Sequence, residues 1–141
     1  MKLVKIVVDI LMLIFLVLSL LRWSGDPTFH IIVGGIFIFL FIIHFILNAK
    51  MFIKMSEKFI QYKIKLKLQY IVDSILILIW VIVTILGVLA AINYLGNNPA
   101  IINFGRLHGV LGRVGCGFIG IHIIQHIKQI HSYFKVKNNG K

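Results

Sequence analysis

Two pairs of histidines with identical spacing are the residues of this sequence best suited to chemistry. The first pair is His30 and His44, and the second is His108 and His122, so each pair has the spacing i, i+14. Such a spacing turns an α-helix by about 1,400°, within about 40° of four complete turns, and advances it by about 21 Å. If each pair lies on one helix, its two imidazoles share a face and stand at two levels.

Two parallel helices with this spacing would bring two imidazoles together at each level. A pair of imidazoles on opposite sides of a flat macrocycle is the ligand set of a six-coordinate haem iron, and helix bundles build such sites in their interior. Burial favours neutral histidine, which is the form that ligates iron. The spacing therefore predicts two b-type haems, one between His30 and His108 and the other between His44 and His122.

Small residues near these histidines leave room for a porphyrin ring. Gly34 and Gly112 each follow the first histidine of their segment at position i+4, and Gly115 lies between the two levels of its segment. Phe37 is the corresponding residue in the other segment. We expect Gly34, Gly112 and Gly115 to border the haems, with Phe37 and Gly115 in the gap between them.

Two further polar residues each have two interpretations or more. Arg106 precedes His108 by one intervening residue, where a guanidinium would either hold a haem propionate or anchor the helix at the membrane interface. His126 follows His122 at position i+4. It is a rival ligand, a donor to a propionate, or a histidine at the inner interface. The sequence provides no partner for Arg113.

Four apolar segments must position these residues. The chain has 141 residues, of which 60% are hydrophobic and 13% charged. A bilayer core of about 30 Å requires about 20 mostly apolar residues per helix. We therefore predict an all-α fold, a transmembrane four-helix bundle that forms a single domain over residues 1–141 and holds two haems between its second and fourth helices. The predicted spans are residues 4–22, 29–49, 70–94 and 101–130.

The lysines indicate the orientation of these spans. Every lysine lies near the N-terminus, in the connector 50–69 or beyond residue 127. Cytoplasmic loops carry an excess of Lys and Arg, so both termini are predicted to be cytoplasmic in a multi-pass protein of the bacterial inner membrane. We expect the connector to form an amphipathic extension or helical bend at the lipid surface. Residues 25–27 and 96–99 have turn composition.

The chain also contains a weak internal duplication. A Val-Asp pair occurs near the cytoplasmic end of the first span, at Asp9, and of the third span, at Asp73. The second and fourth spans share the pattern His-x-x-x-Gly. Such repeats commonly hold a cofactor or substrate between them. Asp9 and Asp73 are predicted to pair with Lys5, with Lys67 or with each other.

Composition excludes several other classes of protein. A soluble domain has roughly a quarter charged residues, and the net charge of +11 on so apolar a chain reflects orientation rather than nucleic-acid binding. The single cysteine, Cys116, excludes an internal disulfide, a four-cysteine cluster and covalent c-type haem. The connectors are too short for a flavin or nucleotide domain, so we expect an electron-transfer subunit rather than a self-contained enzyme.

Histidines at i and i+14 on two parallel transmembrane helices, with glycines near them, resemble the cytochrome b subunits of respiratory formate dehydrogenases and hydrogenases. They also resemble a bacterial four-span family grouped with those subunits. The resemblance extends from the first span to the fourth. It implies that His30, His44, His108 and His122 are axial ligands, and that electrons cross the membrane to or from a quinone or a partner subunit.

A haem-free transporter or scaffold, which uses the histidines for metal or proton passage, is the alternative. An isolated histidine in a span is often a hydrogen-bonded interior residue, but matched positions in two spans favour a shared function. Tetrahedral zinc or copper fits less well. Only two histidines meet at each level, and the levels are about 21 Å apart along the helix.

Overall fold

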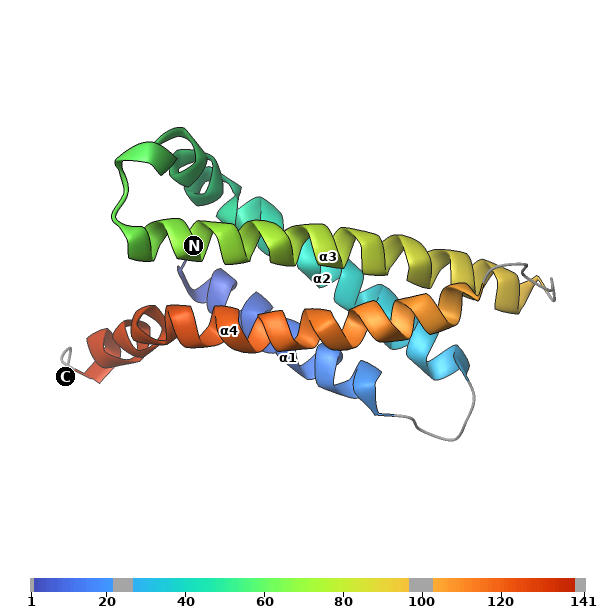
Figure 1. Ribbon diagram of the computed structural model, residues 1–141. Helices are drawn as coiled ribbons and strands as arrows, with labels where there is room; N and C mark the ends of the chain where they lie inside the picture. The colour runs from blue at the N-terminus through green and yellow to red at the C-terminus, as the bar shows by residue number, and fades with distance from the viewer. Residues whose placement is uncertain (1, 22–26, 97–102, 139–141) are drawn as a thin grey trace. The chain divides into compact units, whose positions relative to one another are not determined.

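Helices are the only regular secondary structure of the residues described by the computed structural model, which are 2–21, 27–96 and 103–138, with side chains described as far as residue 127 (Figure 1). The helices are α1 (Lys2–Leu20), α2 (Pro27–Glu57), α3 (Ile64–Leu95) and α4 (Phe104–Asn138), with a short 3₁₀ helix, η1 (Phe59–Gln61), after α2. All four long helices are long and apolar enough to cross a membrane. The predicted all-α class and the four spans are confirmed.

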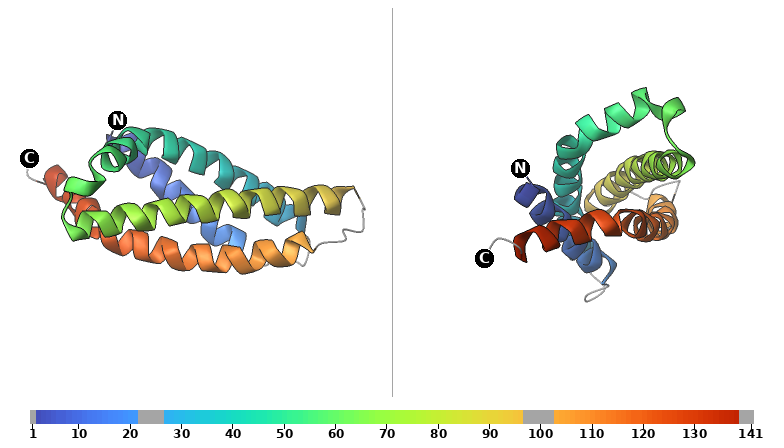
Figure 2. Two further views of the ribbon diagram at one scale, coloured as in Figure 1. Left: turned by 45° about the horizontal axis from the view of Figure 1, so that its top comes forward. Right: turned by 90° about the vertical axis from the view of Figure 1, so that its left-hand side faces the viewer.

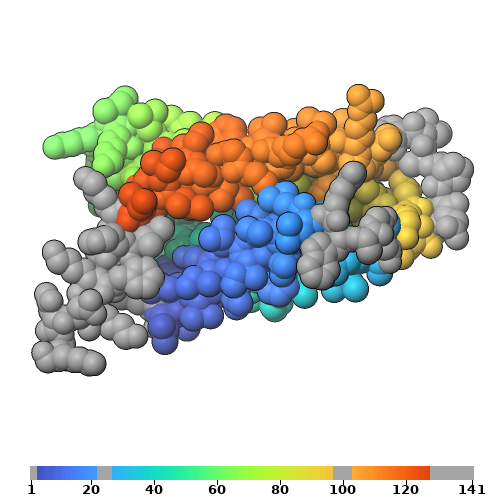
Figure 3. Space-filling view, turned by 90° about the horizontal axis from the view of Figure 1, so that it is seen from below, coloured from blue at the N-terminus to red at the C-terminus, as the bar shows by residue number. Residues whose placement is uncertain are grey.

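The helices expose most of their large apolar side chains. Only Val8, Leu16, Val33, Phe37, Leu40, Trp80 and Val83 form the buried apolar core of the described residues. In water such a surface would promote aggregation, whereas lipid chains solvate it without cost. Figure 3 shows one face of the molecule, over which α4 is exposed along most of its described length. This surface is that of a membrane protein.

The chain divides into two compact helical hairpins. The first hairpin comprises Met1–Lys58, in which α1 packs against α2, and the second comprises Phe59–Lys141, in which α3 packs against α4. Figure 2 shows each pair of helices from two further directions. Each hairpin positions its own pair of histidines.

The helices continue beyond the predicted spans into the lysine-rich connector. With 31 residues, α2 is about 46 Å long, which exceeds the hydrocarbon thickness of about 30 Å. After η1 the chain turns into α3, and Lys67 Nζ lies 5.7 Å from the centre of the Phe59 ring. That ring also packs against Tyr70. Over these residues the chain thus extends α2 beyond the predicted span and then bends into α3.

Side chains and backbone groups define the ends of two helices. The Oδ1 atom of Asn103 accepts a hydrogen bond of 2.9 Å from the backbone N–H of Arg106, so Asn103 caps α4. The backbone N–H of Gly96 donates to Ile92 O at the end of α3. The predicted turn residues 25–26 and 97–99 lie outside the described residues.

Candidate functional site

Each of the four paired histidines uses Nδ1 to contact the other helix of its own hairpin. In the first hairpin, His30 Nδ1 lies 2.9 Å from Ser19 O and His44 Nδ1 lies 2.6 Å from Asp9 Oδ1. In the second, His108 Nδ1 lies 2.9 Å from Val83 O and His122 Nδ1 lies 2.7 Å from Asp73 Oδ1. One carboxylate and one backbone carbonyl therefore orient the two imidazoles of each hairpin.

These contacts determine which nitrogen of each ring can bind a metal. A backbone carbonyl can only accept, so Nδ1 of His30 and of His108 must carry the proton that is donated. An ionised carboxylate imposes the same tautomer on His44 and His122. In a neutral imidazole protonated at Nδ1 the lone pair is on Nε2. Metal-binding histidines commonly have this arrangement, in which the second ring nitrogen donates to a carboxylate or carbonyl.

The two hairpins repeat these contacts in the same register. The acceptors on α1 are Asp9 and Ser19, and those on α3 are Asp73 and Val83, so both helices place them at i and i+10. The histidines that they orient have the spacing i, i+14 on α2 and again on α4. The duplication noticed in the sequence is therefore a duplication of hydrogen bonds as well as of residue types.

The predicted lysine partners of the two aspartates are wrong. Asp9 binds His44, while the ammonium of Lys5 donates to Asn48 Oδ1 at 2.9 Å. Asp73 binds His122. A carboxylate one or two helical turns from a lysine near the membrane surface suggests an ion pair, but the helix crossing brings a histidine closer.

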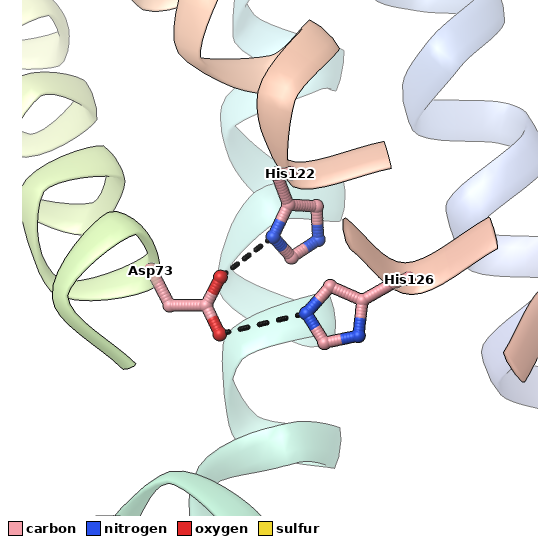
Figure 4. A group of neighbouring side chains, drawn as sticks. All are labelled: Asp73, His122 and His126. Atoms are coloured by element: carbon pink, nitrogen blue, oxygen red, sulfur yellow. Dashed lines mark hydrogen bonds and ion pairs between the residues drawn. The ribbon is translucent and has the colours of Figure 1, made fainter. Parts of the chain in front are cut away.

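Asp73 also faces a second histidine (Figure 4). Its other oxygen, Oδ2, lies 3.7 Å from His126 Nε2, and the rings of His122 and His126 are 4.6 Å apart. Potential ligand atoms of these three residues all lie within 4.8 Å of one another. At the corresponding place in the first hairpin is Asn48, which donates to His44 O. The second hairpin alone therefore has three potential metal ligands together among the described residues.

Gly87, which the sequence analysis did not single out, makes room for His108. A Cβ atom at Gly87 would lie 2.9 Å from Cε1 and 3.0 Å from Nδ1 of the imidazole, closer than such atoms approach. The absence of a side chain thus lets the Nδ1–Cε1 edge of His108 lie against α3. An isolated glycine in a bulky helix is a sequence signal for such close packing.

The predicted glycines fall into two groups. A Cβ atom at Gly34 or Gly112 would meet nothing within 4 Å, so open space lies beside both residues. At Gly115 it would lie 3.2 Å from Ile79 Cγ2 and 3.5 Å from the indole of Trp80. Gly115 therefore permits close packing of α4 on α3, while Gly34 and Gly112 have no neighbouring atom where a side chain would begin.

The two arginines of α4 point away from the core of their hairpin. Arg106 and Arg113 are both exposed, and the backbone of Arg106 belongs to the first turn after the Asn103 cap. Exposed guanidinium groups are suited to an anionic partner such as a propionate carboxylate.

Each hairpin provides two imidazoles of the donor type that a haem iron takes. Nδ1 of each ring contacts an acceptor, a carboxylate for one imidazole of the hairpin and a carbonyl for the other, so Nε2 is the nitrogen that would ligate iron. Open space lies beside Gly34 and Gly112, one helical turn beyond His30 and His108. Comparison with protein-family models, curated proteins and solved structures found no match to this chain.

Proposed function

We propose that the protein transfers electrons across a membrane through two b-type haems, each held by one histidine from each hairpin. His30 with His108 would ligate one iron, and His44 with His122 the other. The observation that carries this proposal is the repeated register of four Nδ1 hydrogen bonds, which fixes four imidazoles in the ligating tautomer. Histidines that served only to satisfy interior polar groups would not need the same spacing in both hairpins.

The haems would supply reversible one-electron chemistry, and the chain's own residues would bind and orient them. Each carboxylate or carbonyl holds its imidazole plane, and the long apolar helices exclude water from the site. Arg106, which is exposed in the first turn of α4, would neutralise a propionate there. The described residues form helices and one short bend, so substrate chemistry belongs to a quinone or a partner subunit.

Lysine placement supports an orientation with both termini in the cytoplasm of a bacterial cell. The lysines from Lys50 to Lys67 occupy the end of α2, the start of α3 and the short segment between them, and positive charge at this end of two membrane-length helices favours the cytoplasmic side. In this orientation Asp9 and Asp73 are near the inner face, and His30 and His108 are near the outer face.

Visible spectroscopy of the purified protein tests the proposal directly. We expect a b-type spectrum whose α-band sharpens on reduction with dithionite, and a pyridine haemochrome assay should give about two haems per chain. A colourless protein purified from cells with ample haem would overturn the proposal.

A haem-free metal transporter or scaffold is the second candidate, because Asp73, His122 and His126 bring three ligand atoms within 4.8 Å. Two histidines and a carboxylate suit Zn²⁺ and related ions. A colourless protein that carries zinc, and loses it when His126 is replaced by alanine, would favour this candidate. The first hairpin has Asn48 where His126 would be, so this function uses only half of the repeat.

Substitution of Gly87 by alanine should weaken one haem selectively. The added Cβ would collide with the His108 imidazole and break its hydrogen bond to Val83 O. Loss of such an orienting contact typically costs about 10- to 100-fold in metal affinity, so we expect haem retention at the His30–His108 level to fall by a similar factor. The rate at which apomyoglobin takes haem from each variant measures this retention.

Gly105→Ala is the matched control. It adds the same methyl group to α4, where the new atom would be 3.7 Å from Asn103 Oδ1, an ordinary contact. Equal haem retention in the two variants would show that Gly87 does not support the ligand.

A further inference from the structure

The acceptors that orient the histidines differ between the two members of each pair. The second histidine of each pair, His44 or His122, donates to the carboxylate of Asp9 or Asp73, at 2.6 and 2.7 Å. The first histidine of each pair has a backbone carbonyl as its acceptor, at 2.9 Å in both hairpins. The shorter, charge-assisted bond thus belongs to the second histidine in both halves of the repeat.

A carboxylate acceptor changes the electronic character of an imidazole more than a carbonyl does. It draws the Nδ1 proton toward itself, which places more negative charge on the ring and strengthens Nε2 as a donor to iron. A stronger donor and a nearby negative charge both favour ferric over ferrous iron, and hydrogen bonding around the ligands is a principal means of tuning haem potentials. A haem held by the carboxylate-bonded histidines would therefore have a lower reduction potential than one held by the carbonyl-bonded histidines.

We propose that Asp9 and Asp73 are positioning residues that lower the reduction potential of one haem and thereby set the direction of electron transfer. The proposal rests on the proposed function. One electron would pass from a haem held by His44 and His122, which would be oxidised, to a haem held by His30 and His108, which would be reduced. No proton is transferred and no bond is broken in this step.

If both termini are cytoplasmic, as the lysine distribution indicates, electrons would move from the cytoplasmic face of the membrane to its outer face. A membrane potential that is negative inside acts on an electron in the same direction. Neighbouring groups modify the two carboxylates differently: Asp73 is 13% exposed and shared with His126, whereas Asp9 is 52% exposed and bonds to His44. Both nevertheless make the same short contact with Nδ1.

Potentiometric titration of the purified haem-loaded protein tests the inference. The wild-type protein should show two one-electron waves, and the lower one should be absent from a His44→Ala variant. In Asp9→Asn and in Asp73→Asn the lower wave should move upward. We expect about a tenfold shift of the reduction equilibrium per carboxylate, which is about 59 mV for a one-electron couple. The higher wave should stay in place, and the double variant should bring the waves together.

Glu57→Gln is the matched control, because it removes an exposed carboxylate from the end of α2 without touching a histidine. It should leave both waves unchanged. Unchanged potentials in both Asn variants, or an equal shift in Glu57→Gln, would overturn the proposal while two bound haems still support the proposed function. A protein without haem would instead refute the proposed function.

If Asp73→Asn does not retain haem, the more exposed Asp9 provides the same test. A wild-type potential in haem-loaded Asp9→Asn then overturns the proposal. Electron paramagnetic resonance of the oxidised protein gives a second readout. The low-spin signal of the lower-potential haem should change in the Asn variants and return toward its wild-type form in Asp9→Glu, which keeps a carboxylate.

Discussion

Purified protein in which His108 is replaced by alanine is expected to contain about one haem per chain instead of about two. A single remaining imidazole holds a b-type haem poorly, because the porphyrin has no covalent link to the chain and iron loses one of its two axial bonds. The same loss is expected for His30→Ala. Replacement of His44 or His122 should remove the other haem. Pyridine haemochrome analysis with protein quantification measures the ratio.

His126→Ala is the control for these substitutions. His126 lies beside Asp73 but has no counterpart in the first hairpin, where Asn48 takes its place. We expect this variant to keep both haems. If it loses a haem while His122→Ala keeps two, the ligand in α4 is His126, and the pairing by repeated spacing is incorrect.

Electron flow across liposome membranes should require all four paired histidines. The i, i+14 spacing separates the two histidines of a helix by about 21 Å along its axis, and under the proposed function the porphyrins would occupy much of that distance. The remaining gap would then be short enough for tunnelling without any movement of the chain. Liposomes that contain trapped ferricyanide and the protein should therefore oxidise an impermeant external reductant, and each His→Ala variant should reduce the rate to that of protein-free liposomes.

If no ferricyanide is reduced, the visible spectrum of the haems during the assay shows whether electrons reached the haems at all. Haems that become reduced while trapped ferricyanide remains unchanged would indicate a cytochrome that serves only one membrane face. His126→Ala, which keeps both haems in the prediction above, should transfer electrons at the wild-type rate.

Sequence patterns predicted the helices of this protein better than its contacts. Four long apolar segments determine four helices because lipid leaves the backbone no other way to satisfy its hydrogen bonds. The helix ends were less predictable. Lysines mark where a helix leaves the hydrocarbon, not where it stops, and α2 continues through Lys50 and Lys54 to Glu57.

The orienting contacts of the histidines were only half visible in the sequence. Asp9 and Asp73 stood out because a carboxylate in a span is rare, although their partners were predicted incorrectly. The acceptors at Ser19 and Val83 are backbone carbonyls, which every residue has, so no residue type could reveal them. Only the crossing of two helices determines which carbonyl lies next to an imidazole.

The surroundings of the glycines could not be predicted from the sequence either. Gly115 was predicted to provide space for a cofactor, yet Ile79 and Trp80 lie where its side chain would be. Gly87 lies against His108. A sequence shows that a side chain is missing, but the neighbouring helix decides whether the space remains open or is filled.

The four Nδ1 hydrogen bonds each stay within a single hairpin, which has a consequence for biogenesis. The first hairpin ends at Lys58, so His30 and His44 can acquire their final ring orientations while the ribosome is still synthesising α3. The second hairpin orients His108 and His122 in the same independent way. Under the proposed function, haem would join two hairpins whose ligands are already set, and its delivery would be the last step of maturation.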